Sequence, residues 1–394
     1  MRHAFVPWQF RYGTIVPIVK DHHGNLSDTD NYRGITMSPI LSKILEHTLR
    51  QLFSEFLTTS KLQFGFKGGS STIHAIHCLK ETVNYYCKRG SNVFVSFLDA
   101  SKAFDRVVHA GLFLKMLNRN TPLIFLELIM YWYSELYCRV RWDEQYSNWF
   151  RIIAGVRQGG ILSPDLYSLY VDDLVRILSE QKVGCHIRNR FLSVILYADD
   201  TALLSPSLKG LQKLLTACEH FCDKWDICLN PKKTKNIYFG KRLPSLSALT
   251  LNGCAIEWTE KCPYLGIILH SHTEFDCCIS EKVRKFYRAL NCILRIEGRT
   301  NDLLALRLIE IHCIPILTYG IEIICVANRD SRRQMRVAYN TVFRRIFNYR
   351  QWQSVRELQT FLNRPTWEEL VESRTNRFLH RLQNDTFFSS LVVD

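Results

Sequence analysis

The chain has 394 residues, and its 51 Lys and Arg against 37 Asp and Glu give a formal net charge of +14. Hydrophobic residues make up 47% of the sequence and charged residues 22%, while Gly and Pro occur only 18 and 11 times. This composition excludes a disordered or collagen-like chain, because it supplies ample apolar surface for a buried core. The length allows one large domain or two to three ordinary ones.

The 14 cysteines are scattered and form no Cys-x-x-Cys pair, so neither a zinc ribbon nor a secreted disulfide framework is indicated. We expect mostly reduced, partly buried thiols of an intracellular protein. The longest apolar stretches, at 123–137 and 309–327, contain glutamates that a lipid-facing helix tolerates poorly, so no membrane span is expected. The N-terminus has no apolar run of signal-peptide length.

Basic residues are concentrated between positions 282 and 350, where few acids accompany them. A surplus of Lys and Arg predicts a polyanionic partner such as a nucleic acid, since phosphates attract these side chains. A solvated helix face explains the same pattern equally well.

In chain order, the predicted elements begin with a β-rich arm at 13–20 that ends in a polar turn at 21–30. Helical periodicity follows at 38–56, with Pro39 in the first turn, and again at 72–86. A mostly apolar strand at 92–98 ends at Asp99. Helices are then expected at 110–118, 123–137 and 164–178.

Two further strands, at 191–198 and 201–204, are separated only by Asp199 and Asp200, which fits a two-residue hairpin turn. A helix at 208–225 and short strands at 237–239 and 267–269 complete an α+β domain with helices on one face of the sheet. Beyond Asp276 the pattern is helical, with a break at Pro315. We therefore predict a domain boundary near residue 275.

Asp99, Asp199 and Asp200 form the candidate catalytic group. If their strands are neighbours, the three carboxylates converge, and such a cluster repels itself unless a cation neutralises it. Carboxylate oxygens suit Mg²⁺, and two such ions stabilise the attacking and leaving oxygens in phosphoryl transfer. Ordinary turn chemistry also explains an Asp-Asp pair between strands.

Further segments, in a fixed order, make the pattern specific. They are PIVK at 17–20, NYRGI at 31–35, QFGF at 63–66, DASKAFD at 99–105, GVRQGGILSP at 155–164, LNPKKT at 229–234 and YLG at 264–266. With the aspartates they resemble the reverse transcriptase domain of non-LTR (LINE-type) retrotransposons, over residues 15–269.

The resemblance implies an α+β right-hand polymerase, in which a palm with an antiparallel sheet and helices on one face follows the fingers and precedes an all-helical thumb. We expect fingers at 1–90, palm at 91–275 with fingers helices inserted at about 110–150, and a helical thumb with a basic C-terminal extension at 276–394. Neither an upstream endonuclease nor a C-terminal Cys/His knuckle is visible, so a fragment or truncated copy is expected.

The implied function is an RNA-directed DNA polymerase, part of a retrotransposon-derived protein, that adds dNTPs to a primer 3′-hydroxyl with two Mg²⁺ ions, for which Mn²⁺ can substitute. The implied partners are an RNA template, a DNA primer and dNTPs, and no membrane. A location in nucleus or cytoplasm is implied by the family alone. The alternative is a catalytically inactive or truncated reverse-transcriptase-like module that binds RNA.

Carried over residue by residue, the three aspartates become metal ligands, and the main-chain carbonyl of Leu98 or Ala100 completes one site. The implied dNTP and template contacts are Lys20 and Arg33 on triphosphate oxygens, Phe104 as the steric gate against a ribonucleotide 2′-hydroxyl, Gln158 and Gly159 beneath the nascent base pair, and Tyr197 at the primer terminus. For Lys20 and Arg33 the alternative is a solvated surface cation, and for Phe104 a core phenylalanine. Arg157 either touches template phosphate or faces water.

Lys233 is the implied general acid that protonates pyrophosphate, although Lys232 and Lys235 are close enough to compete. The implied primer grip is Tyr264, Leu265 and Gly266. Three other carboxylates, Asp105, Asp172 and Asp173, are not assigned to metal, and the last two are expected in mid-helix. A structural role is favoured for the group Cys218, His220 and Cys222.

Overall fold

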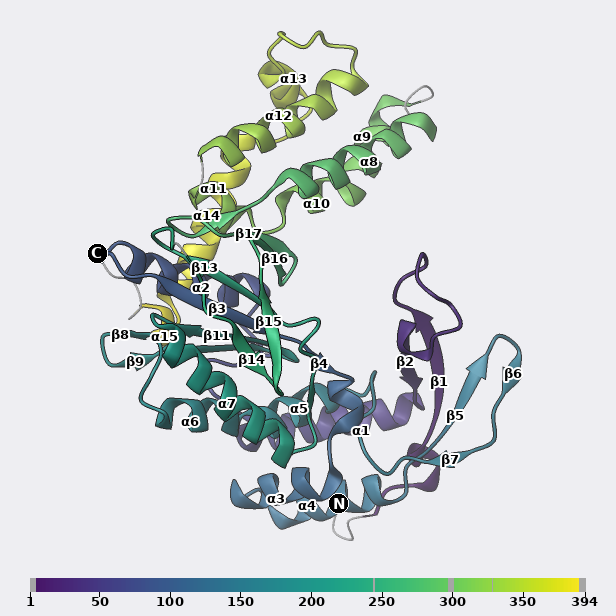
Figure 1. The fold of residues 1–394 in the computed structure, drawn as a ribbon. Helices are drawn as coiled ribbons and strands as arrows, with labels where there is room; N and C mark the ends of the chain where they lie inside the picture. Colours follow the sequence, from purple (N-terminus) through teal and green to yellow (C-terminus); the bar gives the residue numbers. More distant parts are fainter. Residues whose placement is uncertain (1–4, 244, 297–300, 328, 390–394) are drawn as a thin grey trace.

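The computed structural model describes residues 5–243, 245–296, 301–327 and 329–389. Its central sheet has six strands in the order β10-β11-β3-β13-β15-β14 (Figure 1). These strands are Val194–Tyr197 (β10), Asp200–Ser205 (β11), Val93–Leu98 (β3), Lys235–Phe239 (β13), Cys254–Trp258 (β15) and Leu249–Leu251 (β14). Pairing is antiparallel from β10 to β13 and parallel between β13 and β15.

The middle strand β3 is the core of this sheet, since all six of its residues are buried. Its one polar side chain, Ser96, donates a hydrogen bond of 2.7 Å to Asn236 Oδ1 on β13, so the hydroxyl is not left unpaired. Helices α2 (Thr72–Cys87) and α7 (Leu208–Lys224) pack against β3 and its neighbours. Both helices were predicted from their apolar spacing.

A second sheet joins segments that lie far apart in sequence. Strand β1 (Tyr12–Val19) pairs antiparallel with β2 (Tyr32–Met37) and parallel with β5 (Tyr137–Trp142), which also carries β6 (Gln145–Tyr146) and β7 (Phe150–Arg151). Helices α3 (His109–Asn118) and α4 (Leu123–Ser134) confirm the helices predicted at 110–118 and 123–137. The residues from 137 to 151, where helix was expected to continue to about 150, form strands that extend the β1 sheet.

Helix α1 (Ile40–Leu52), followed by the short 3₁₀ turn η3 (Ser54–Leu57), occupies the position predicted for it but has an unexpected orientation. Ile40 and Leu41 on its apolar stripe are 75% and 60% exposed, whereas Ser42 and Glu46 are buried with Leu49. The helical spacing was therefore predicted correctly, but only part of the apolar stripe, including Leu45 and Leu49, packs against the core.

The helix expected at 164–178 is two helices, α5 (Ser163–Val171) and α6 (Asp173–Glu180), divided at Asp172. Several short strands lack a sequence signal long enough to be noticed. They are β4 (Ala100–Ser101), β8 (His186–Ile187), β9 (Arg190–Phe191), β12 (Cys228–Leu229), β16 (Lys261–Tyr264) and β18 (Asp276–Cys277). The predicted strand near 267–269 is β17 (Ile267–His270), which pairs with β16 and β18.

After β18, the described residues contain helices and no strand, as predicted. These helices are α8 (Ser280–Ile296), α9 (Asp302–His312), α10 (Ile314–Thr318), α11 (Ile321–Ala327), α12 (Arg329–Ile346), α13 (Arg356–Phe361), α14 (Trp367–Gln383) and α15 (Thr386–Ser389). The break at Pro315 is confirmed by the step from α9 to α10.

The last helices return to the body of the molecule. In Figure 1, α8, α9, α12 and α13 project as an arm, whereas α14 and α15 run back toward α2. The ring centroid of Phe378 on α14 lies 5.2 Å from that of His74, and the ring of Phe388 on α15 lies 5.3 Å from the same histidine. The C-terminal segment therefore completes the apolar environment of α2.

Within the described ranges, no helix is both long and apolar enough to cross a membrane. The cysteines whose surroundings the structure describes are free thiols.

Candidate active site

Strands β10 and β11 form a tight hairpin in which Tyr197 pairs with Asp200. The two loop residues are therefore Ala198 and Asp199, one position earlier than the Asp199-Asp200 turn predicted from sequence. Ala198 has a φ of 57°, the left-handed conformation that such a short hairpin loop requires. Strand pairing thus fixes the position of Asp200, while Asp199 lies at the tip of the hairpin. The half-buried Tyr197 is the last residue of β10 before this tip.

The segment 62–65 holds this tip in place, which the sequence did not indicate. Phe64 N donates to Leu196 O at 2.7 Å, so the segment runs along the free edge of β10. Gln63 is fully buried, and its Oε1 accepts a hydrogen bond of 3.2 Å from Ala198 N. A Cβ on Gly65 would lie 2.4 Å from Ala198 N, so only glycine fits at that position.

Asp99 follows β3 directly and is held by the loop before β13. Leu98 pairs with Thr201, so Asp99 and Asp200 occupy the next register position of the β3–β11 ladder. Asn230 N donates to Asp99 O at 2.9 Å, and Asp99 N lies 3.5 Å from the Thr234 hydroxyl that accepts from it. The structure thus brings together the ends of β3, β10 and β11, with their three aspartates.

The electrostatics of these carboxylates reflect their proximity. Burial, together with the charges of Asp199 and Asp99, raises the pKa of Asp200 to about 6. Burial and the charge of Asp99 also raise the pKa of Asp199, while the charge of Arg33 lowers it. A divalent cation relieves such repulsion, and a set of carboxylate oxygens has the chemistry that Mg²⁺ prefers.

Among the described residues, no group of three His, Cys, Asp or Glu side chains is arranged to hold a metal ion by itself. Mg²⁺ commonly takes only one or two protein carboxylates and completes its shell with water and substrate phosphates. A divalent cation at these strand ends would therefore use one or two of the aspartates and take its other ligands from water and a phosphorylated substrate.

Phe104 lies in the 3₁₀ turn η4 (Ala103–Arg106), where it is partly buried and packs against the core. Its ring stacks on that of Tyr167, with centroids 4.6 Å apart and an interplanar angle of 15°. Burial raises the pKa of Tyr167, and the charges of Asp199 and Asp200 add to this rise. The Phe104 ring therefore lies one side chain away from the aspartates.

The loop at 155–160 is wedged between η4 and β2. Gly155 has a φ of 90°, and a Cβ there would lie 2.8 Å from Asp105 O. Gly159 has a φ of 112°, and a Cβ there would lie 2.8 Å from Thr36 O. Gln158 bridges the two sides, because its carbonyl accepts from Thr36 N at 2.7 Å and its Nε2 donates to Asp105 Oδ1 at 3.3 Å. The two glycines therefore allow the loop to approach the backbones of η4 and β2 closely.

Arg157, in the same loop, corrects both expectations for it. Its side chain is 5% exposed and pairs at 2.7 Å with Glu46 Oε1 on α1, whose side chain is 4% exposed. The other Glu46 oxygen accepts from the backbone N–H groups of Ile161 and Leu162. Arg157 thus anchors the loop to α1, and its guanidinium is buried against Glu46 rather than exposed to bulk water. No local signal identifies Glu46 as its partner, because they are 111 residues apart.

The expected phosphate-binding cations come from separate elements. Lys20 follows β1, and its Nζ donates to Asp30 O at 2.8 Å. Arg33 on β2 lies close enough to Asp199 to lower the pKa of that carboxyl. Lys233 is exposed in the turn before β13, whereas Lys235 is paired with Glu257 of β15 and is therefore a weaker candidate for the general acid. Lys232 is also exposed.

The expected primer grip is the β16–β17 hairpin, whose two loop residues Leu265 and Gly266 have φ values of 43° and 81°. Tyr264 is buried, and its ring centroid lies 4.6 Å from that of Phe97 on β3. Tyr319, between α10 and α11, donates from its hydroxyl to Leu265 O at 2.7 Å. The hairpin is thus attached both to the central sheet and to the helical part.

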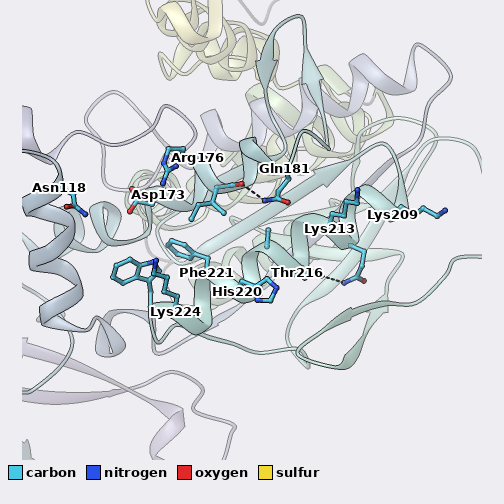
Figure 2. Close-up of a pocket in the computed structure, with 14 residues that line it drawn as sticks. Asn118, Asp173, Arg176, Gln181, Lys209, Lys213, Thr216, His220, Phe221 and Lys224 are labelled. Atoms are coloured by element: carbon cyan, nitrogen blue, oxygen red, sulfur yellow. Dashed lines mark hydrogen bonds between the residues drawn. The ribbon is translucent and has the colours of Figure 1, made fainter.

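The carboxylates not assigned to metal have other partners. Asp172 pairs with Arg119 and accepts from Ser60 N at 2.7 Å. Asp173 lies 3.2 Å from the buried Lys115, at the edge of a groove of about 960 Å³ between α6 and α7 (Figure 2). None of the three candidate catalytic aspartates lines this groove.

Comparison with known proteins agrees with this geometry. The family model described as reverse transcriptase (RNA-dependent DNA polymerase) matches residues 19–269, more than half of the chain. The probable RNA-directed DNA polymerase from transposon BS of Drosophila melanogaster is 29% identical over 97% of this chain and 43% of its own length. The RNA-directed DNA polymerase from mobile element jockey of Drosophila funebris is 27% identical over 98% of this chain and 43% of its own length. The chain therefore spans less than half the length of these relatives.

A solved structure of telomerase from Candida tropicalis, in complex with the TWJ fragment of telomeric RNA, matches with a TM-score of 0.50 and 14% identity. The match covers 98% of this chain and 64% of that one. At this identity the likeness concerns the fold alone, and it confirms the predicted α+β right-hand architecture.

Proposed function

The chain belongs to the reverse transcriptase (RNA-dependent DNA polymerase) family, as a LINE-type domain, and from that premise we propose that it adds dNTPs to a primer 3′-hydroxyl under the direction of an RNA template. The observation that carries the proposal is the meeting of Asp99, Asp199 and Asp200 at the ends of β3, β10 and β11, with the pKa values of the last two raised.

The three aspartates would hold two Mg²⁺ ions, or Mn²⁺ in their place, with the main-chain carbonyl of Leu98 or Ala100. Bound there, the ions would stabilise the attacking and leaving oxygens of an in-line phosphoryl transfer. The raised pKa values of Asp199 and Asp200 support this assignment, because their surroundings disfavour the charged carboxylates and a bound cation would favour them.

Nucleotide selection falls to residues around the aspartates. Arg33 and Lys20 would donate charge-assisted hydrogen bonds to the triphosphate. Phe104 would exclude a 2′-hydroxyl, which its partly exposed ring stacked on Tyr167 supports. Lys233 would give its proton to the departing pyrophosphate, a role for which its exposed ammonium is free of the ion pair that engages Lys235.

Template and primer would lie across the same surface. Gln158 and Gly159 would support the nascent base pair, and Tyr197 would pack against the primer terminus. The hairpin Tyr264, Leu265 and Gly266 would hold the primer strand. In this proposal the fingers are 1–90, the palm is 91–275 and the thumb with its C-terminal extension is 276–394. The protein would act inside the cell, in the nucleus or the cytoplasm.

The test is primer extension on poly(rA)/oligo(dT) with Mg²⁺ and dTTP. The chain should extend the primer, Asp199→Asn should not, and both should bind the duplex with similar affinity. Asp172→Asn is the control for a carboxylate outside the site. If neither the chain nor Asp199→Asn extends but both bind in a salt-dependent manner, the domain is the RNA-binding module and the polymerase proposal fails.

A further inference from the structure

Asp30, in the 3₁₀ turn η2 (Thr29–Asn31) that precedes β2, reaches across to the strand end that carries Asp99. Its Oδ1 lies 2.6 Å from Nζ of Lys102. Lys102 follows the short strand β4, which comes directly after Asp99. This ion pair therefore joins the β1–β2 hairpin to the central sheet beside the candidate active site.

Two further cations surround the same carboxylate. Lys20 Nζ donates to the main-chain oxygen of Asp30 at 2.8 Å. The hydrogen bond and charge of Lys102, followed by the charges of Lys20 and Lys233, lower the pKa of Asp30. Three lysines from three separate segments thus converge on one carboxylate, and two of them are the cations that the proposed function gives to the triphosphate and the pyrophosphate.

The backbone of Lys102 is also unusual. Its φ of 52° is in the left-handed region that a lysine rarely adopts, and its carbonyl accepts from Asp105 N at 2.9 Å. Such conformations persist where the surrounding structure fixes them, and they are concentrated at functional sites. The turn directs Lys102 toward the hairpin while Phe104 stacks on Tyr167.

We propose that Asp30 occupies the place that a nucleotide triphosphate takes when it binds, and that Lys102 is a further phosphate-binding residue which exchanges Asp30 for a triphosphate oxygen. This inference rests on the proposed polymerase function. The Lys102 and Asp30 side chains are 54% and 65% exposed, so their pair is weak and readily displaced. A triphosphate brings several negative charges to the same lysines and replaces Asp30. Because Asp30 competes with the triphosphate for these lysines, it lowers the apparent affinity for dNTPs.

The competing explanation is that the ion pair only holds the hairpin against the sheet. It predicts the opposite effect of removing the charge of Asp30 on nucleotide binding. If the ion pair only held the hairpin in a binding-competent position, removing the charge of Asp30 would weaken nucleotide binding. If Asp30 competes with the triphosphate, removing its charge strengthens binding.

The experiment uses Asp30→Asn, Lys102→Gln and the double variant, with Asp223→Asn on the exposed face of α7 as the control for a change in net charge. Binding of inorganic tripolyphosphate is measured by calorimetry in the presence of Mg²⁺, and KM and kcat for dTTP are measured by primer extension. Asp30→Asn should tighten tripolyphosphate binding and lower KM by roughly two- to fivefold with kcat unchanged, while Asp223→Asn changes neither. Lys102→Gln should weaken tripolyphosphate binding and raise KM for dTTP. In the double variant, the tighter binding caused by Asp30→Asn should largely disappear.

Weaker or unchanged tripolyphosphate binding by Asp30→Asn overturns the inference. Because this measurement needs no catalysis, it separates the two proposals. A chain that never extends a primer, yet binds tripolyphosphate more tightly as Asp30→Asn, refutes the polymerase proposal and supports the competition between Asp30 and the anion.

Discussion

The buried Gln63 accepts, through its Oε1, a hydrogen bond of 3.2 Å from the backbone N–H of Ala198, a residue 135 positions later. Ala198 is the left-handed loop residue that precedes Asp199. The position of the catalytic candidate therefore depends on a segment that belongs to a different part of the sequence.

Gly65 tests this dependence. Gly65→Ala places a Cβ against the backbone of Ala198, so the hairpin tip must move. We expect the free energy of unfolding to fall by about 1–3 kcal/mol and the extension rate to fall at least about tenfold, as a small displacement of catalytic groups has such effects. Gly68→Ala is the matched control, because a Cβ there meets nothing within 4 Å. Equal behaviour of the two variants in urea denaturation and primer extension would refute the role of Gly65.

The ion pair between Arg157 and Glu46 should be structural. Arg157→Met leaves a buried carboxylate without its counter-ion, and we expect a loss of about 3–5 kcal/mol in the free energy of unfolding. Adding Glu46→Gln should recover part of this loss, since the neutral amide can still accept from the backbone of the loop. Normal stability of Arg157→Met combined with weakened RNA binding would show that the arginine contacts template instead.

His77 should make the fold acid-sensitive. Burial, together with the charge of Lys80, lowers the pKa of His77 to about 3. In the unfolded chain, His77 takes up a proton near pH 6.5, whereas in the folded chain it stays neutral. The contribution of neutral His77 to the free energy of unfolding is therefore complete above pH 6.5 and is lost as the pH falls below it. This residue alone should lower the free energy of unfolding by about 1.4 kcal/mol at pH 5.5 relative to pH 8.

Urea denaturation at the two pH values measures this effect, and His77→Phe is the comparison because the ring already contacts Phe378 and Phe388. The variant should show a smaller pH dependence than the parent chain. An identical dependence would mean that His77 is not the responsible group.

Phe104 should set the preference for deoxyribonucleotides. Phe104→Val removes the ring that stacks on Tyr167 and opens space for a 2′-hydroxyl. We expect kcat/KM for rNTPs to rise by about tenfold or more relative to dNTPs, because a steric exclusion of this kind is worth about 1–3 kcal/mol. The ratio is measured by single-nucleotide incorporation of dTTP and UTP. An unchanged ratio would assign the ring to packing alone.

Much of this arrangement could be predicted from local sequence. An apolar strand ending at Asp99, a strand pair around Asp199 and Asp200, and amphipathic helices each leave a signal within a short window. The order of the motifs then indicated the α+β right-hand fold, which the likeness to telomerase confirms.

What sequence did not provide are pairings between distant segments. The β1–β5 ladder, the edge contact of Gln63 and the partnership of Arg157 with Glu46 each join residues more than 100 positions apart. Helix α1 shows the same limit, because its periodicity is clear but its buried face is chosen by the polar Glu46 and its partners. The one-residue shift of the hairpin loop arises because strand pairing, rather than Asp-Asp turn propensity, sets the register.

The most direct measurement of the central claim is single-turnover incorporation of one dTTP on poly(rA)/oligo(dT) by Asp99→Asn, Asp199→Asn and Asp200→Asn, each with its duplex affinity. Stability should be preserved in Asp200→Asn, because the folded state already disfavours the charged form of that carboxyl, whose pKa is about 6. Each variant should lose at least about a thousandfold in rate, since metal-held charge stabilisation is worth several kcal/mol, while duplex affinity changes little. A folded variant of any of the three that retains a rate within tenfold of the parent chain would contradict the claim that all three aspartates form one catalytic group.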